Sequence, residues 1–472
     1  MKNVNRDFMA LLFGRLLQIV ITLFTLRVST TILPEEELGT VYFVVAIQAF
    51  FVLSFISPIG QYFTRQTNCW FVGGVLRKNL FKYSLYLLLI AVVAFLLLSL
   101  TRLLGITDLS FDLILIISCL IFSQSANQTI VPLFNMIEHR YAFVTFNLMT
   151  ALLSAIFSFL LLIYWSETSK SWLLGIVLGN MTVTGISVWW MKNNIHQNNN
   201  AREPKNNNVS EVVSFALPIA FSTFFMWFLA SGYRVLIEHA YGLAFLATLG
   251  VGLAVSCQIF SIVESLLMQY FVPALYRNIG GVCKDTRLKF INQYISTVIP
   301  IYFSLAIFLT FAIEYIFPFL VAEKYYTSYM IAVYGVWVEL FRVLTNAFAI
   351  TGQIEKVTSR TVLPYIIGST VLASTLSLNY YLKLEINVMF LLIASNALVL
   401  IYMVVKMNSL QRVSLPIKNI SILGVSAIPA VFFLIWGNIT QEASINSLLL
   451  LCIGVVIYFL GFVFSFGKLK ND

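Results

Sequence analysis

Charged side chains interrupt the long apolar stretches of this sequence at only a few places: Arg15, Arg27, Arg234, Glu264, Glu314, Glu339 and Arg342. An arginine at the centre of a lipid-facing helix costs roughly 2.5–3.5 kcal/mol on insertion scales. Several such residues in one chain therefore predict a hydrated or protein-lined interior. Because a planar guanidinium can bind two phosphate oxygens at once, the first three arginines are candidate ligands for a phosphorylated molecule. The competing interpretation is that they extend to lipid headgroups.

The acidic groups suit a different role. Glu264 and Glu314 are candidates for binding a proton within an apolar segment. Glu339 and Arg342 lie three residues apart on one face of a helix, where they can also neutralise each other. Amides in the apolar segments are candidate hydrogen-bonding partners for sugars. Gln18 and Gln258 are the preferred candidates, and the others are Gln48, Asn127, Gln128, Gln269 and Asn346.

The sequence contains no motif for nucleotide hydrolysis or for metal binding. There is no glycine-rich phosphate loop for nucleotide hydrolysis, and neither the three histidines nor the five cysteines have metal-binding spacing. The acidic run Glu35–Glu37 raises the alternative of a membrane glycosyltransferase, but only about five residues separate the apolar segments on either side of it. We therefore interpret this run as a solvated turn, and we expect a protein that is not an enzyme, with no cofactor and no metal.

Composition determines which elements must position these residues. Hydrophobic residues make up 60% of the 472 residues and charged residues 10%, against about 45–50% and 25% in soluble domains. The sequence therefore predicts an all-α integral membrane protein. Fourteen apolar segments are close to the ~20 residues that one crossing needs: 8–33, 38–58, 81–104, 111–134, 143–165, 172–191, 212–233, 242–270, 294–321, 330–350, 362–382, 387–405, 417–436 and 447–466.

The net charge of +9 follows the membrane topology rather than a nucleic-acid partner. With the N-terminus in the cytoplasm, most of the 29 Lys and Arg residues fall on the cytoplasmic side. This distribution is the positive-inside signal. It predicts an even number of crossings with both termini in the cytoplasm.

An internal repeat divides the chain. At an offset of 207 residues, Arg27 and Val28 align with Arg234 and Val235, and the run at 73–75 aligns with the run at 280–282. Six helices per copy make the repeat parallel, with a pseudo-twofold axis along the membrane normal. We predict an N-terminal lobe at 1–195, an Asn-rich cytoplasmic linker at 196–210, a second six-helix lobe at 211–410 and an appended hairpin at 411–472.

Several of these features together resemble a known family. An apolar segment with Pro218 inside and Arg234 at its outer end, followed by a turn at Gly242, resembles the start of the second half of bacterial polysaccharide flippases. The run Leu33-Pro34-Glu35-Glu36-Glu37-Leu38-Gly39 is similar to the hairpin between their first two helices, and Pro58-Ile59-Gly60 to the end of their second helix. These flippases belong to the multidrug/oligosaccharidyl-lipid/polysaccharide exporter (MOP) superfamily.

The resemblance implies a function. It implies a monomeric flippase in the bacterial cytoplasmic (inner) membrane that moves undecaprenyl-pyrophosphate-linked oligosaccharides outward by alternating access, for O-antigen, lipopolysaccharide or capsule synthesis. Arg15, Arg27 and Arg234 would then neutralise the diphosphate. Membrane lipids, and the polymerase and glycosyltransferases of the pathway, would be its partners. The alternatives are a multidrug or cation antiporter of the same superfamily and a membrane glycosyltransferase or polymerase.

Overall fold

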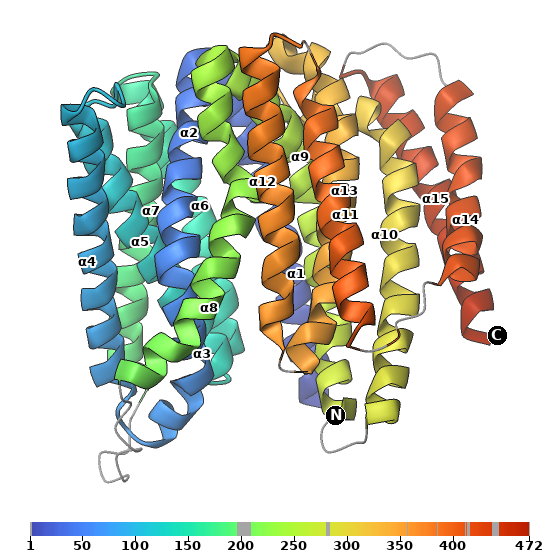
Figure 1. Ribbon diagram of the computed structural model, residues 1–472, viewed down its shortest axis with the longest axis horizontal. Coiled ribbons are helices and arrows are strands. Elements are labelled where there is room, and N and C mark those ends of the chain that lie inside the picture. Colours follow the sequence, from blue (N-terminus) through green and yellow to red (C-terminus); the bar gives the residue numbers. More distant parts are fainter. Residues whose placement is uncertain are drawn as a thin grey trace. The chain divides into compact units, whose positions relative to one another are not determined.

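The computed structural model describes residues 2–195, 209–279, 284–355, 357–384, 386–410, 412, 416–436 and 443–471. Throughout these ranges the backbone forms helices joined by short turns, with no strand (Figure 1). The chain divides into two compact units, Met1–Leu246 (unit 1) and Ala247–Asp472 (unit 2). The prediction of an all-α integral membrane protein is confirmed.

Unit 1 contains eight helices, two π-helical turns and the start of a ninth helix. They are α1 (Lys2–Ile32), α2 (Glu35–Phe51), the π-helical turn η1 (Val52–Ile56), α3 (Ser57–Val72), α4 (Leu76–Leu103), α5 (Phe111–Met136), α6 (Arg140–Tyr164), α7 (Ser169–Asn194), α8 (Val209–Trp227), the π-helical turn η2 (Phe228–Gly232) and the first part of α9 (Tyr233–Ile279).

Unit 2 contains the rest of α9, followed by α10 (Lys284–Leu320), the 3₁₀ turn η3 (Glu323–Ser328), α11 (Tyr329–Ile354), the 3₁₀ turn η4 (Thr358–Thr361), α12 (Val362–Tyr381), α13 (Val388–Asn408), α14 (Ile417–Trp436) and α15 (Ile445–Asn471). The last two helices pack on α10, where the rings of Phe308 and Tyr458 stack with centroids 4.4 Å apart.

The number of spans agrees with the sequence. The described residues contain 13 helical stretches that are long and apolar enough to cross a membrane. One of them, Val212–Val272, runs for 61 residues, about three times the ~20 needed for one crossing. Gly242 breaks it at φ 82°, ψ 174°, a left-handed conformation that glycine adopts without steric cost. The predicted turn at Gly242 is thus confirmed, and this stretch accounts for two of about fourteen crossings.

The predicted end of the second span at Pro58 is wrong. The helix continues through η1 into α3 and ends only at Val72. Pro58 lies in the first turn of α3, directly after η1, so the proline, which cannot donate a hydrogen bond, coincides with a local change in the helical hydrogen-bonding pattern. The proline therefore marks a local rearrangement of the helix and not its end.

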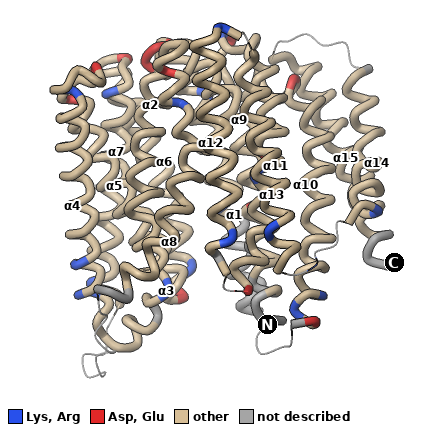
Figure 2. The backbone as a smooth tube through the Cα atoms, in the orientation of Figure 1, with Lys and Arg blue, Asp and Glu red and all other residues tan. Residues whose placement is uncertain are grey.

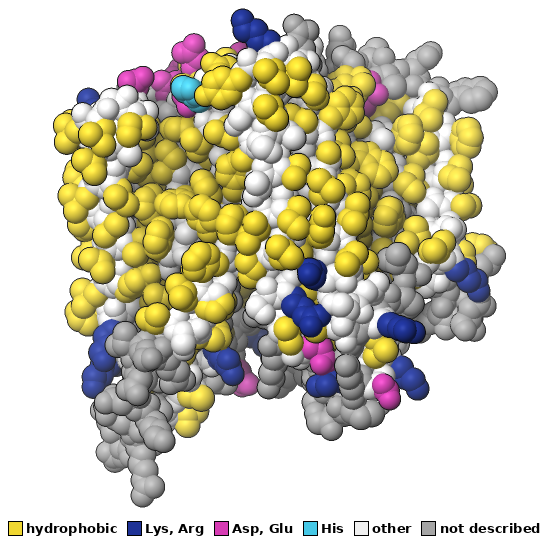
Figure 3. Space-filling view, viewed as in Figure 1, with side chains coloured by type: hydrophobic (Ala, Val, Ile, Leu, Met, Phe, Trp, Pro, Cys, Tyr) yellow, Lys and Arg dark blue, Asp and Glu magenta, His cyan; other side chains and the backbone are white. Residues whose placement is uncertain are grey.

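Side chains follow the expected division between lipid and water. Helix α4 begins with Arg77 and Lys78, whereas Glu35–Glu37 begin α2 at the opposite end of unit 1 (Figure 2). Between the charged ends, hydrophobic side chains dominate the visible surface (Figure 3). Below, the outer end of a helix is the one that the predicted topology places outside the cell.

Small residues, Gly175 and Gly179, bring two helices of unit 1 into close contact. A Cβ atom at Gly175 would collide with the backbone of Ser158, and one at Gly179 with that of Ser154. Glycine at these positions lets α6 and α7 approach each other closely, a common device in membrane helices. The predicted lobes remain a prediction; residues 196–208 of the linker and 280–282 of the repeat lie outside the described residues.

Candidate functional site

Arg15 belongs to a polar network inside unit 1. Its Nη1 donates to Oε1 of Gln18 at 2.9 Å, one turn further along α1. The same oxygen accepts a hydrogen bond from Nδ2 of Asn147 on α6 at 3.2 Å. Two residues taken from the sequence as candidate ligands, Arg15 and Gln18, are thus held together, and both are half-buried. Asn147 was missed, because nothing in the sequence indicates that α6 faces α1 at this level.

Arg27 lies on the same helix but at a different depth. Twelve residues separate it from Arg15, which corresponds to about 18 Å along the helix at ~1.5 Å per residue. One diphosphate group is too short to contact both guanidinium groups. If both arginines contact one ligand, they contact parts of it that lie at different depths in the membrane.

Arg234 lies near the outer end of unit 1. Its Cζ is 5.5 Å from the centre of the Tyr42 ring on α2, a cation–π contact. In the neighbouring turns Nε1 of Trp227 donates to the Ala46 carbonyl at 2.8 Å. Helix α2 thus holds the segment that carries Arg234 through aromatic side chains.

The acidic turn at the start of α2 also has a structural role. Oε2 of Glu37 accepts a hydrogen bond from the backbone N–H of Ser169 at 2.6 Å. A carboxylate at this position satisfies one of the otherwise unpaired N–H groups of α7 and interacts favourably with the helix dipole. Glu35 and Glu36 are exposed, as expected for a solvated turn.

Unit 2 contains a compact charged cluster. Arg342 on α11 forms ion pairs with Glu339 at 2.7 Å and with Glu264 of α9 at 3.0 Å. Nδ2 of Asn346 donates to the other oxygen of Glu264 at 2.9 Å. The predicted pairing of Glu339 with Arg342 is confirmed. With both carboxylates ionised the cluster would carry one net negative charge.

The other two candidates in unit 2 lie apart from these ion pairs. Gln258 and Glu314 are half-buried on α9 and α10. No hydrogen bond or ion pair within the described residues joins Glu314 to Glu264, so their roles remain separate predictions.

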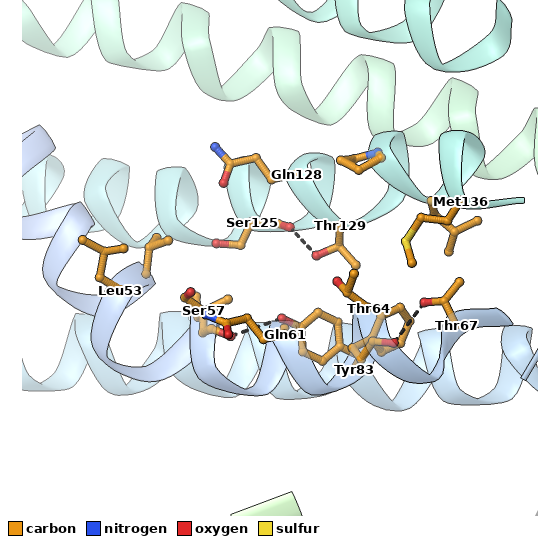
Figure 4. A pocket seen from close by; sticks show the side chains of 16 residues that line it. Leu53, Ser57, Gln61, Thr64, Thr67, Tyr83, Ser125, Gln128, Thr129 and Met136 are labelled. Atoms are coloured by element: carbon orange, nitrogen blue, oxygen red, sulfur yellow. Dashed lines mark hydrogen bonds between the residues drawn. The ribbon is translucent and has the colours of Figure 1, made fainter. Parts of the chain in front are cut away.

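A cavity of about 350 Å³ lies between η1–α3, α4 and α5 of unit 1 (Figure 4). Half of its lining is polar and uncharged: Ser57, Gln61, Thr64, Thr67, Tyr83, Ser125, Gln128 and Thr129. The remainder consists of Gly60 and apolar side chains: Val52, Leu53, Ile56, Phe63, Pro132, Leu133 and Met136. None of the described lining residues is charged.

Of these polar residues the sequence singled out only Gln128. A signal for others was present, because Ser57, Gln61 and Thr64 recur at helical spacing and form a polar stripe along α3. The wrong end assigned to the second span at Pro58 concealed it.

The fold of this chain is similar to the folds of several solved membrane transporters. The lipid II flippase MurJ, in an inward closed conformation, superimposes with a TM-score of 0.68 at 13% identity, over 98% of this chain and 99% of MurJ. The eukaryotic MATE transporter AtDTX14 gives a TM-score of 0.56 at 12% identity, over 89% of this chain and 96% of that one. A MOP-superfamily transporter from Pyrococcus furiosus, described as having a binding pocket of reverse polarity, gives a TM-score of 0.51 at 13% identity, over 90% of this chain and 96% of that one.

Comparison of the sequence alone finds no relative. No protein-family model matches the chain, and no curated protein matches it. The likeness is therefore one of fold, and it agrees with the superfamily that the sequence resembles.

Proposed function

We propose that this protein is a flippase that moves undecaprenyl-diphosphate-linked oligosaccharides from the inner to the outer leaflet of a bacterial cytoplasmic membrane. Both termini would lie in the cytoplasm, and the product would supply an O-antigen, capsule or related surface glycan. The polymerase and glycosyltransferases of that pathway would act before and after it. The fold is compatible with this role, since transporters of the MOP superfamily share it.

The observation that carries the proposal is the sign of the charge within the helices of unit 1. Arg15 lies well inside α1 and donates a hydrogen bond to Gln18, whose side-chain oxygen also accepts from Asn147. In the described parts of α1 to α7, acidic residues occur only near helix ends and in turns. An interior with surplus guanidinium attracts a diphosphate and repels organic cations. We therefore prefer a lipid-diphosphate cargo to the cationic drugs of an antiporter.

The charged cluster of unit 2 is the candidate for coupling. Protonation of Glu264 or Glu339 would weaken an ion pair to Arg342, so that binding of a proton could favour one conformation over another. The membrane potential is an alternative source of energy, worth about 2.3 kcal/mol per charge per 100 mV. This cluster is also the feature that favours the second candidate, a cation antiporter, because it contains two carboxyl groups and one guanidinium.

The test replaces Arg15 with Ala or Lys in a host that depends on the protein for surface glycan. Arg15→Ala should lower surface glycan and cause the lipid-linked precursor to accumulate inside, because the diphosphate loses its partner. Arg15→Lys should retain part of the activity, since the positive charge remains. Arg102→Ala is the matched control: its guanidinium lies over the Phe111 ring at 4.0 Å near the outer ends of α4 and α5.

Unchanged glycan export in a correctly inserted Arg15→Ala, Arg234→Ala double variant would contradict the proposed site. Export of a cationic dye that competes with protons, without any effect on lipid-linked glycan, would favour the antiporter.

A further inference from the structure

We propose that the neutral cavity between η1–α3, α4 and α5 binds a sugar residue of the cargo, separately from the arginines that would contact its diphosphate. The inference rests on the proposed function for the source of the sugar. The cavity, of about 350 Å³, lies at the lower end of the ~300–1,000 Å³ typical of small-molecule sites. It suits one sugar residue better than a whole oligosaccharide.

The lining selects the class of ligand. A diphosphate would require cationic partners and a metal ion or organic cation would require carboxylates, but the described lining is uncharged. An acyl chain would leave the lining amides and hydroxyls without partners in an apolar environment, which costs free energy. A sugar donates and accepts hydrogen bonds through its hydroxyls and presents C–H faces to apolar side chains. It therefore matches both parts of the lining.

Several of the polar groups are available to a ligand. Gln61, Thr64 and Gln128 are exposed and have no hydrogen-bond partner among the described residues. Ser125 is only 3% exposed, and its hydroxyl has no partner in the described part of the chain. A buried hydroxyl without a partner costs free energy that a bound ligand can recover. In Figure 4 these side chains come from both walls of the cavity.

Three other hydroxyls of the lining are oriented by backbone carbonyls. Thr67 donates to the Phe63 carbonyl at 2.9 Å and Thr129 to the Ser125 carbonyl at 2.7 Å. Tyr83 donates to the Ile56 carbonyl at 3.4 Å. Each hydroxyl keeps lone pairs that can accept from a sugar. The cavity thus combines fixed acceptors with amides that can adjust.

The position of the cavity suits loading from the cytoplasmic side. Its residues on α5 all lie in the second half of that helix, Ser125–Met136, towards the predicted inner end. Arg65 lies one turn beyond Gln61 on the same face of α3. The wall also contains the π-helical turn η1, a distortion that often accompanies functional sites.

The experiment measures binding of free neutral monosaccharides to the full-length protein in lipid nanodiscs, by saturation-transfer NMR. Nanodiscs avoid glycosidic detergents, whose headgroups would compete for the site. The probes are N-acetylglucosamine, galactose and rhamnose, with inorganic diphosphate as the anionic competitor. Thr64→Val and Gln128→Leu each remove polar groups at the cavity without filling it.

At least one sugar should give saturation transfer, and each cavity variant should weaken its binding about two- to tenfold, the effect of one neutral hydrogen bond. The matched control is Thr182→Val, which removes an exposed hydroxyl on α7 that donates to the Leu178 carbonyl at 2.7 Å; it should leave binding unchanged. Inorganic diphosphate should not displace the sugar.

The inference is overturned if none of the sugars binds, if both cavity variants bind as well as the parent protein, or if diphosphate displaces the sugar. These results leave the proposed function open, because that function is measured through accumulation of the lipid-linked precursor. Conversely, sugar binding that depends on Thr64 and Gln128, in a protein whose Arg15→Ala variant exports glycan normally, would support the cavity and remove the proposed role of the arginine.

Discussion

Loss of Arg342 should destabilise the protein far more than loss of an exposed cation in a similar ion pair. Arg342 is 30% exposed and contacts Glu264 and Glu339, whose side chains are 17% and 12% exposed. Removing one partner of a buried ion pair costs about 3–5 kcal/mol, because the other charge is left without compensation. Solvent screening at the partly exposed guanidinium reduces this to about 2–3 kcal/mol for Arg342→Gln.

The matched control is Lys170→Gln. Lys170 pairs with Asp112 at 3.1 Å, close to the 3.0 Å between Arg342 and Glu264. The side chains of Lys170 and Asp112, however, are 42% and 79% exposed. Exposed pairs contribute about 0–1 kcal/mol. Because the distances are similar, a larger effect of Arg342→Gln reports the lower exposure of its ion pair with Glu264 together with the second ion pair, to Glu339.

The assay is the midpoint of thermal denaturation in detergent, followed by loss of the monodisperse peak on size exclusion. For a cooperative unit of 150–250 residues, 1 kcal/mol corresponds to roughly 2–4 °C. The midpoint should therefore fall by roughly 5–10 °C for Arg342→Gln and by no more than a few degrees for Lys170→Gln. Replacing Glu264 and Glu339 with Gln in the Arg342→Gln variant should restore most of the lost stability, since no buried charge then remains unpaired.

Equal shifts for Arg342→Gln and Lys170→Gln would refute the reasoning. So would a triple variant that is no more stable than Arg342→Gln alone. Either result would mean that the cluster is hydrated well enough for its ions to behave as surface charges.

Two further substitutions test contacts within unit 1. Gly39→Ala should lower the denaturation midpoint, because a Cβ atom there would collide with the Leu243 carbonyl; overpacking costs typically 1–3 kcal/mol, more than the ~1 kcal/mol that alanine gains over glycine in a helix. Glu37→Ala should destabilise the protein by about 0.5–2 kcal/mol, because the N–H of Ser169 loses its acceptor and α7 loses a cap.

Each of these substitutions has a matched control on the same chain. Gly185→Ala places a Cβ in open space on α7, so it should be neutral or slightly stabilising. Glu35→Ala removes an exposed carboxylate from the first turn of α2 and should change the midpoint little. A Gly39→Ala variant as stable as Gly185→Ala, or a Glu37→Ala variant as stable as Glu35→Ala, would count against the contact concerned.

The membrane class, the approximate number of spans and the local pairs were predictable from the sequence because each depends on neighbouring residues. Bilayer thickness fixes the length of an apolar segment. The turn at Gly242 depends on the conformational freedom of one residue. The pairing of Glu339 with Arg342 depends on a spacing of three within one helix.

The continuation of the second helix past Pro58 was not predictable in the same way. A proline is compatible both with the end of one helix and with the first turn of the next. Only the conformation of the preceding segment, here the π-helical turn η1, decides between them. That error concealed the polar stripe of α3, and with it the cavity.

Which residues meet across helices was decided by the tertiary structure alone. Gln18 meets Asn147 from 129 residues away, and Glu264 meets Arg342. In a soluble helix the apolar stripe would have identified the buried face. In a membrane helix both the lipid-facing and the packed faces are apolar, so hydrophobicity does not indicate which way a polar side chain points. The sequence therefore determined which residues lie in the membrane, and packing of the helices determined which of them form a site.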